Sequence, residues 1–272
     1  MPTSYAHYKF GQEVKEKLSK DILTIINEYP QLYHLGLHGP DLLFYYNALK
    51  KNHVNTTGFR LHEYSGRYVF SRAAKVIKDK KMNHAHMAYI FGFLCHYSLD
   101  VSCHGCVNAF DATGIAGHLE IEAELDREML VRDGKDPLST RLTGHLVSSK
   151  ENAEVMKDFF PGISTQDIEK SIKDTIFYLN FLVAPKKWKR WLFVTGLKMV
   201  GKYEKFGGLM INVEKNQDCK ETVDRLIELY DDAIDLAVSL IEEYPHYLMG
   251  EKELDEVYKY SFDSELPKIG KE

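Results

Sequence analysis

Residues 95–107 read CHYSLDVSCHGCV, and either the cysteines or the histidines and the aspartate of this stretch could carry its chemistry. The stretch contains a C-x-x-C, which is typical of redox and zinc sites. It also places His96, Asp100 and His104 at steps of four residues. On an α-helix each such step turns the side chain by only about 40°, so the three would line one face over two turns. The two patterns predict different proteins, and the rest of the chain favours one of them.

Apolar residues recur at three- and four-residue steps through nearly the whole chain. The clearest run spans 220–244, and another at 164–183 opens with Ser164, a good helix N-cap. No run alternates in the manner of a strand. We therefore expect an all-α fold, a multi-helix bundle of roughly eight to ten helices. The expected helices span 9–28, 40–50, 65–80, 84–108, 117–132, 164–183, 186–204 and 220–244, with loops at 52–58, 113–114, 133–137 and 161–162.

Composition is that of a globular protein, with 44% hydrophobic and 28% charged residues among 272. The net charge of −5 argues against a stable nucleic-acid partner, which requires basic surface. Four cysteines in a chain of this length make no disulfide framework. The opening MPTSYAHYKFGQEV has no apolar run of a signal peptide, so a cytoplasmic location is expected.

Histidines concentrate in the first half of the chain, where ten of the twelve precede residue 120. We expect a single all-α domain over 1–272, with a metal-binding front half at 1–135 and a helical back half at 136–272. The loop at 133–149 separates these halves without dividing the chain into domains.

The face that carries the histidines is expected to point into the bundle, because the apolar Tyr89 and Phe93 share it. A buried aspartate between two imidazoles is costly unless a cation lies beside it. The next expected helix repeats this four-residue spacing with His118 and Glu122. Imidazole and carboxylate ligands of this kind suit zinc, and less specifically manganese or iron.

The C-x-x-C of Cys103 and Cys106 fits its two alternatives less well. A redox pair belongs at a helix N-terminus, where the helix dipole lowers a thiol pKa, and this pair lies near the far end of an expected helix. A structural zinc site would need a second cysteine pair, and Cys219 is the only cysteine downstream. We expect these cysteines to be small buried hydrophobic residues.

Five segments in order carry a family resemblance: TSYAHYKFG, GLHGPDLLFYY, GFRLHEY, GFLCHYSLDVSCHG and GHLEIEAELD. With them, residues 1–135 resemble the zinc-dependent phospholipase C family, the α-helical trizinc phosphodiesterases. The single-strand-specific zinc nucleases are similar to this family in fold and ligands. The resemblance implies a phospholipase C or zinc nuclease-like bundle.

The resemblance also implies three metal sites. The implied ligands are Asp41, His62, His96 and Asp100 for the first metal, His104, His118 and Glu122 for the second, and His7 with a bridging Asp100 for the third. His38 and His53 compete with His62 for its place, whereas His84 and His86 are expected to be structural or surface groups. The gap between Asp100 and His104 is shorter than in secreted bacterial members, and Met1-Pro2 stands where those members begin with a metal-binding Trp.

The expected cofactor is Zn²⁺, two or three ions, with Mn²⁺ or Fe²⁺ as alternatives. Bridging metals would lower the pKa of a water toward ~7 and stabilise a phosphoryl group, with Asp41 as general base. The expected function is a metal-dependent phosphodiesterase of the phospholipase C type, acting on a phosphate ester, with phospholipid as one candidate. A single-strand-specific zinc nuclease and a catalytically inactive metal-binding protein stay open as alternatives.

One basic segment in the back half suggests a membrane role. Residues 186–205, KKWKRWLFVTGLKMVGKYEK, hold seven basic residues and one acid. Such a helix could make a peripheral contact with an anionic bilayer through its tryptophans. The alternative, which the sequence favours, is that Trp191 and Leu192 pack inward and leave the lysines in solvent.

Overall fold

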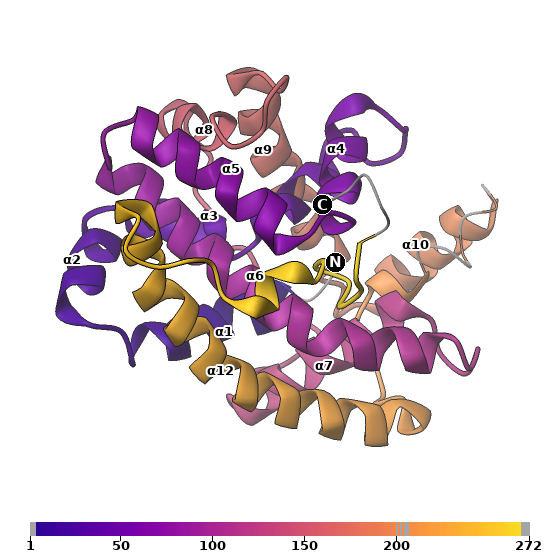
Figure 1. Cartoon of the computed structure of the whole chain (residues 1–272). Helices are drawn as coiled ribbons and strands as arrows, with labels where there is room; N and C mark the ends of the chain where they lie inside the picture. Colours follow the sequence, from indigo (N-terminus) through magenta and orange to yellow (C-terminus); the bar gives the residue numbers. More distant parts are fainter. Residues whose placement is uncertain (1–3, 200, 202, 204–206, 268–272) are drawn as a thin grey trace.

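The computed structural model describes residues 4–199, 201, 203 and 207–267, and these form an all-α fold (Figure 1). The expected fold class is therefore confirmed, although the helices outnumber the eight to ten expected. Over the described residues the only β-type pairing is an isolated bridge between Ser65 and Ser261. The helices are α1 Ser4–Lys15, α2 Lys20–Glu28, α3 Pro30–Gly36, α4 His53–His62, α5 Gly66–Asp79, α6 His84–Asp111, α7 His118–Arg132, α8 Lys150–Lys157, α9 Thr165–Leu182, α10 Lys187–Met199 and α12 Lys220–Met249, with the 3-10 helices η1 Gly39–Tyr45, η2 Gly207–Leu209, η3 Gln217–Cys219 and η4 Glu256–Lys259.

Helix α6 runs through the middle of the molecule and is buried along most of its 28 residues (Figure 1). Helices α3 and α12 pack on it. The crossing with α3 is close because glycines face each other there. A Cβ on Gly92 would lie 2.1 Å from the carbonyl oxygen of Tyr33, and one on Gly36 would lie 2.2 Å from that of Tyr89. Only glycine allows the two backbones to approach this far.

Three of the expected boundaries were wrong. The single helix expected at 9–28 is divided into α1 and α2, and Ser19 at the break donates its N–H and hydroxyl to Glu242 of α12. The loop expected at 52–58 is instead the start of α4, because Asn52 and Asn55 form a capping box. The helix expected at 40–50 is only the short 3-10 helix η1. Helices α3 and α8 were not expected at all.

The C-terminal segment returns across α6 and covers it, as the yellow part of the trace shows (Figure 1). The hydroxyl of Tyr97 on α6 donates to the carbonyl oxygens of Val257 and Tyr260, at 2.7 and 3.0 Å. Phe262 is fully buried against the same helix, 4.9 Å from the ring of Tyr97. Residues more than 150 positions apart thus meet around the middle of α6.

The structure also shows how far the cysteines and the side chains of α10 are buried. Cys95, Cys103 and Cys219 are buried free thiols, as expected of small hydrophobic residues, whereas Cys106 is only half-buried. The expectation that Trp191 and Leu192 pack inward is wrong, since their side chains are 64% and 53% exposed. Across the described part of the chain, no helix combines the length and apolar character needed to span a bilayer.

Candidate metal centre

Helix α6 presents His96, Asp100 and His104 along one buried face, as their four-residue spacing predicts. All three are at most 2% exposed. Burying such polar groups costs free energy unless they are paired or bind a metal. Side chains from three other helices and from η1 meet them there, and they form three groups of potential metal ligands.

The first group joins Asp41, His62 and His96. The Gly-Pro-Asp sequence that starts η1 brings Asp41 to α6, and Gly39 makes this approach possible. Gly39 has a φ of +48°, and a Cβ on it would lie 2.6 Å from the imidazole of His96. His62 ends α4, and its Nε2 lies 2.9 Å from Oδ1 of Asp41.

Asp100 lies between this group and a second one, His7, His96 and Asp100. Its Oδ2 is 3.1 Å from Nε2 of His96 and 3.8 Å from Nε2 of His62. Its Oδ1 is 3.3 Å from Nε2 of His7 on α1. The two oxygens of one carboxylate thus face two ligand groups, which is the arrangement of a bridging ligand.

The third group consists of His104, His118 and Glu122. Oε1 of Glu122 lies 3.4 Å from Nε2 of His104 and 3.2 Å from Nε2 of His118. His118 starts α7 and its side chain is 29% exposed, whereas the other seven potential ligands are buried. The centre therefore reaches solvent on the α7 side.

Backbone carbonyl groups set the tautomers of two of the imidazoles. Nδ1 of His62 donates to the carbonyl oxygen of Gly58 at 3.0 Å, and Nδ1 of His104 donates to that of Phe262 at 2.6 Å. A carbonyl can only accept, so Nδ1 carries a proton and Nε2 is the nitrogen that faces the ligand group, where a metal would take the place of its proton. Supporting contacts of this kind orient metal-binding histidines.

The carboxylates are held in their ionised form despite their burial. Desolvation raises the pKa of Asp100, but the neighbouring His96 and His104 outweigh it and hold the pKa well below its usual range. The pKa of Asp41 is lowered in the same way by His96 and His62. That of Glu122 is lowered to about 2 by His104 and His118, against desolvation. Anionic oxygens are the form in which carboxylates bind metals.

The distances and the unpaired atoms both fit divalent metal. Zinc binds N and O at about 2.0–2.1 Å, so two ligands at a tetrahedral angle are roughly 3.3 Å apart. The nitrogen-to-oxygen distances within the groups, 2.9–3.8 Å, lie around this value. Nε2 of His96 and Oδ2 of Asp100 form no hydrogen bond although they are buried, and neither does Oε2 of Glu122. Ligand atoms aimed at a common ion, rather than at each other, have this geometry.

The remaining histidines of the front half lie outside these groups. His38 bonds His145, Nε2 to Nε2 at 2.7 Å, and His53 is exposed at the start of α4. His62 is therefore the histidine of the first ligand group, and the two alternatives to it, His38 and His53, lie outside the groups. His84 is an exposed partner of Glu28, and His86 is a buried partner of Asp158.

Two further side chains lie in the centre's surroundings, and sequence reasoning missed the first of them, Asp126. Asp126 continues the four-residue spacing of His118 and Glu122 by one more turn, and it accepts the N–H of Ala6 at the start of α1. Tyr45 ends η1 and is half-buried. Desolvation raises its pKa first, and the charges of Asp41 and Glu122 raise it further.

A family model described as zinc dependent phospholipase C matches residues 6–175. This match covers more than half of the chain and includes all eight potential ligands. The chain belongs to the zinc-dependent phospholipase C family. No curated protein and no solved structure matches the chain. Membership of the zinc-dependent phospholipase C family implies a zinc-dependent hydrolase of phosphate esters. Met1 and Pro2, which stand where secreted members have their Trp, lie outside the described residues.

Proposed function

We propose that the chain is a metal-dependent phosphodiesterase of the phospholipase C type, which hydrolyses a phosphate ester of a phospholipid with water. One observation carries the proposal: the imidazoles of His7, His62 and His96 lie within 3.1–3.8 Å of the buried carboxylate of Asp100. His104 follows Asp100 one turn along α6 and belongs to the neighbouring ligand group. Asp41, His62, His96 and Asp100 would hold the first ion, His104, His118 and Glu122 the second, and His7 with Asp100 a third. The expected ions are zinc, with manganese or iron as alternatives.

Bound divalent ions would supply positive charge for the phosphoryl oxygens and lower the pKa of a water toward ~7. The protein's own part is to hold three carboxylates ionised, fix the imidazole tautomers through Gly58 and Phe262, and exclude bulk water by burial. We assign proton acceptance from the attacking water to Asp41, whose carboxylate is ionised at neutral pH.

Assays on three substrates test the proposal. Protein prepared without chelators should hydrolyse bis-p-nitrophenyl phosphate, and it should hydrolyse phosphatidylcholine faster than single-stranded DNA. The opposite order would assign the chain to the nuclease alternative. Bound zinc without hydrolysis of any of the three would leave a metal-binding protein that lacks turnover. The cytoplasmic location stays a prediction.

A further inference from the structure

Helix α10 has an unusual surface. Seven of its thirteen residues are apolar, yet none of the thirteen is buried. The only two tryptophans of the chain, Trp188 and Trp191, are 60% and 64% exposed, and Leu192 beside them is 53% exposed. Large apolar side chains grouped on a surface mark an interaction site. A helix of this length is also marginally stable unless its apolar residues pack against something.

The end of α9 extends the same apolar surface. Phe177 and Phe181, one turn apart, are 63% and 43% exposed, and their rings are 6.3 Å apart. Phe181 contacts Phe193 of α10 at 6.0 Å. These residues, with Trp188, Trp191 and Leu192, are called the aromatic face below. All of it lies beyond residue 175, where the family match ends.

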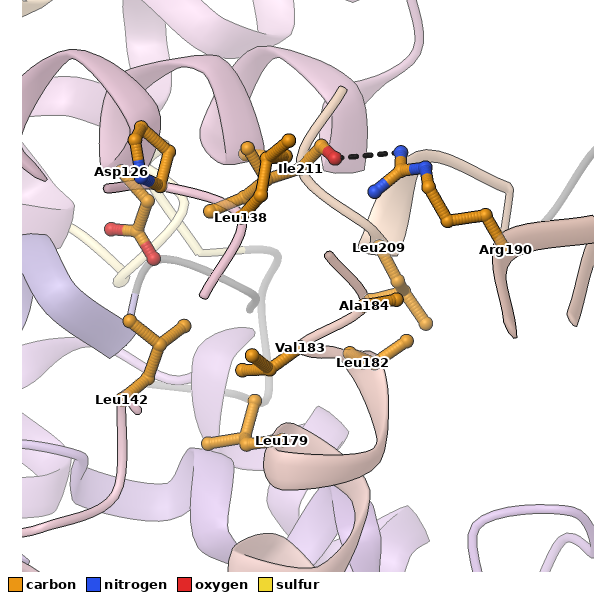
Figure 2. A pocket seen from close by; sticks show the side chains of 12 residues that line it. Asp126, Leu138, Leu142, Leu179, Leu182, Val183, Ala184, Arg190, Leu209 and Ile211 are labelled. Atoms are coloured by element: carbon orange, nitrogen blue, oxygen red, sulfur yellow. Dashed lines mark hydrogen bonds between the residues drawn. The ribbon is translucent and has the colours of Figure 1, made fainter. Parts of the chain in front are cut away.

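Helix α10 is joined to the rest of the molecule by a hydrogen bond and by the lining of a small cavity. Figure 2 shows the junction, where Arg190 donates to the carbonyl oxygen of Ile211 at 2.8 Å. Beside it is a cavity of about 20 Å³, room for about one water, lined by side chains that include Leu138, Leu142, Leu179 and Leu182. The bond from Arg190 and the lining of this cavity thus attach α10 to the rest of the molecule, and the helix itself extends outward beside α7 (Figure 1).

A series of rings connects this face with the metal centre. Tyr45, which shares η1 with the potential ligand Asp41, stacks on Tyr178 of α9 at 6.2 Å. Tyr178 contacts Phe177 at 5.3 Å. Helix α9 is also hydrogen-bonded to the residue after Asp41, since the hydroxyl of Thr175 donates to the carbonyl oxygen of Leu42.

The charge of the region identifies what it contacts. Residues 186–199 include five basic residues and no acid. Lys186 and Lys187 are exposed, next to Trp188. Exposed tryptophans together with basic side chains are typical of a helix that lies in the headgroup layer of an anionic membrane. The rest of the chain is acidic, so it would be repelled from such a surface and would leave the basic side facing it.

We propose that the aromatic face docks on an anionic lipid bilayer and brings the metal centre to the headgroup layer. The tryptophans and phenylalanines enter the interface, Lys186 and Lys187 contact lipid phosphates, and Tyr45 and Tyr178 lie between the bilayer and the ligands. The inference rests on the proposed function, since a docked hydrolase needs a phospholipid to cleave.

The test uses the two tryptophans as its probe. Wild-type protein is mixed with phosphatidylcholine vesicles, with and without phosphatidylserine, and binding is followed by co-sedimentation and tryptophan emission. We expect phosphatidylserine-dependent binding that weakens with salt, together with an emission shift to shorter wavelength, because every tryptophan is on α10. K186A/K187A should lower the partition coefficient about 30-fold, from the loss of two basic residues. W188A/W191A should lower it roughly tenfold or more.

A matched control is V131A/M249A, which truncates two exposed apolar residues outside α9 and α10, 51% and 58% exposed. It should bind vesicles as the wild type does. Wild-type binding that ignores phosphatidylserine, or W188A/W191A binding at wild-type strength, would overturn the inference. So would a protein dimer that shields both tryptophans without lipid. Wild-type hydrolysis of bis-p-nitrophenyl phosphate separates the two proposals: hydrolysis without vesicle binding rejects the docking surface alone, and binding without hydrolysis rejects the proposed function alone.

Discussion

The carboxylate of Asp126 accepts the backbone N–H of Ala6 at 2.8 Å. It also accepts the N–H of Tyr5, so a side chain of α7 caps the first turn of α1. His7 follows immediately on α1, and Glu122 precedes Asp126 by one turn on α7. One hydrogen-bonded carboxylate thus fixes the relative position of two helices that carry potential metal ligands.

Removing this cap should destabilise the protein and loosen His7. We expect Asp126→Ala to lower the free energy of unfolding by about 1–2 kcal/mol, the usual cost of a lost N-cap, as measured by urea denaturation. Asp126→Asn is the intermediate variant, because its one amide oxygen can accept from Ala6 or from Tyr5 but not from both, so it should retain part of the stability. Equal stability of Asp126→Ala and wild type would show that α1 is positioned by packing alone.

Asp100 contacts three imidazoles, so its charge should matter more than that of any other ligand. We expect Asp100→Asn to lower hydrolysis of bis-p-nitrophenyl phosphate by more than about 100-fold, since changes to mere supporting partners of metal ligands cost about 10–100-fold. Zinc content measured on the same samples should fall as well.

The control for this substitution is Asp158→Asn. Asp158 also bonds a histidine, His86 at 2.9 Å, but lies outside the ligand groups. Its activity and zinc content should stay at the wild-type level. Full activity of Asp100→Asn would remove Asp100 from the centre.

The glycine crossing of α3 and α6 gives a test of the fold. Gly92→Ala should lower the free energy of unfolding by more than about 3 kcal/mol, because the new methyl would lie 2.1 Å from the carbonyl oxygen of Tyr33. Gly105→Ala is the control on the same helix. Its methyl would meet Ser264 at an ordinary 3.7 Å, so helix propensity should make it neutral or up to about 1 kcal/mol stabilising. Similar thermal unfolding of the two variants would contradict the close approach.

Local spacing explains which parts could be predicted from the sequence. The His-x3-Asp-x3-His and His-x3-Glu patterns determine helix faces directly, and the structure brings them together with Asp41, His62 and His7. The last three are far apart in the chain, so the family resemblance was needed to place them. The contacts from the carbonyl groups of Gly58 and Phe262 to the histidines could not be predicted from the sequence, because every residue has a carbonyl group. The break at Ser19 depends on Glu242, more than 200 residues away, which no local pattern contains.

The pair of the buried His38 and the half-buried His145 should make stability depend on acid. Burial, with a smaller contribution from His34, lowers the pKa of His145 from 6.5 to about 3. Between these values the unfolded chain binds a proton that the folded protein does not, so stability is lost as pH falls below 6.5. The loss from this one histidine is at most about 1.4 kcal/mol per pH unit.

His145→Gln keeps a polar side chain at this position and removes the titration. We expect its free energy of unfolding, measured by urea denaturation, to fall less steeply than that of the wild type on acidification. Taking the difference between the two proteins cancels the titration of the metal ligands, which they share. Identical slopes would show that folding leaves the pKa of His145 unchanged.

We propose above that side chains from α1, η1, α4, α6 and α7 surround metal ions. The most direct measurement is an anomalous-scattering map at the zinc absorption edge, from crystals of protein that has met no chelator. We expect one peak among Asp41, His62 and His96 and another among His104, His118 and Glu122. A map without a peak at either position, from protein whose fold is intact, would contradict it.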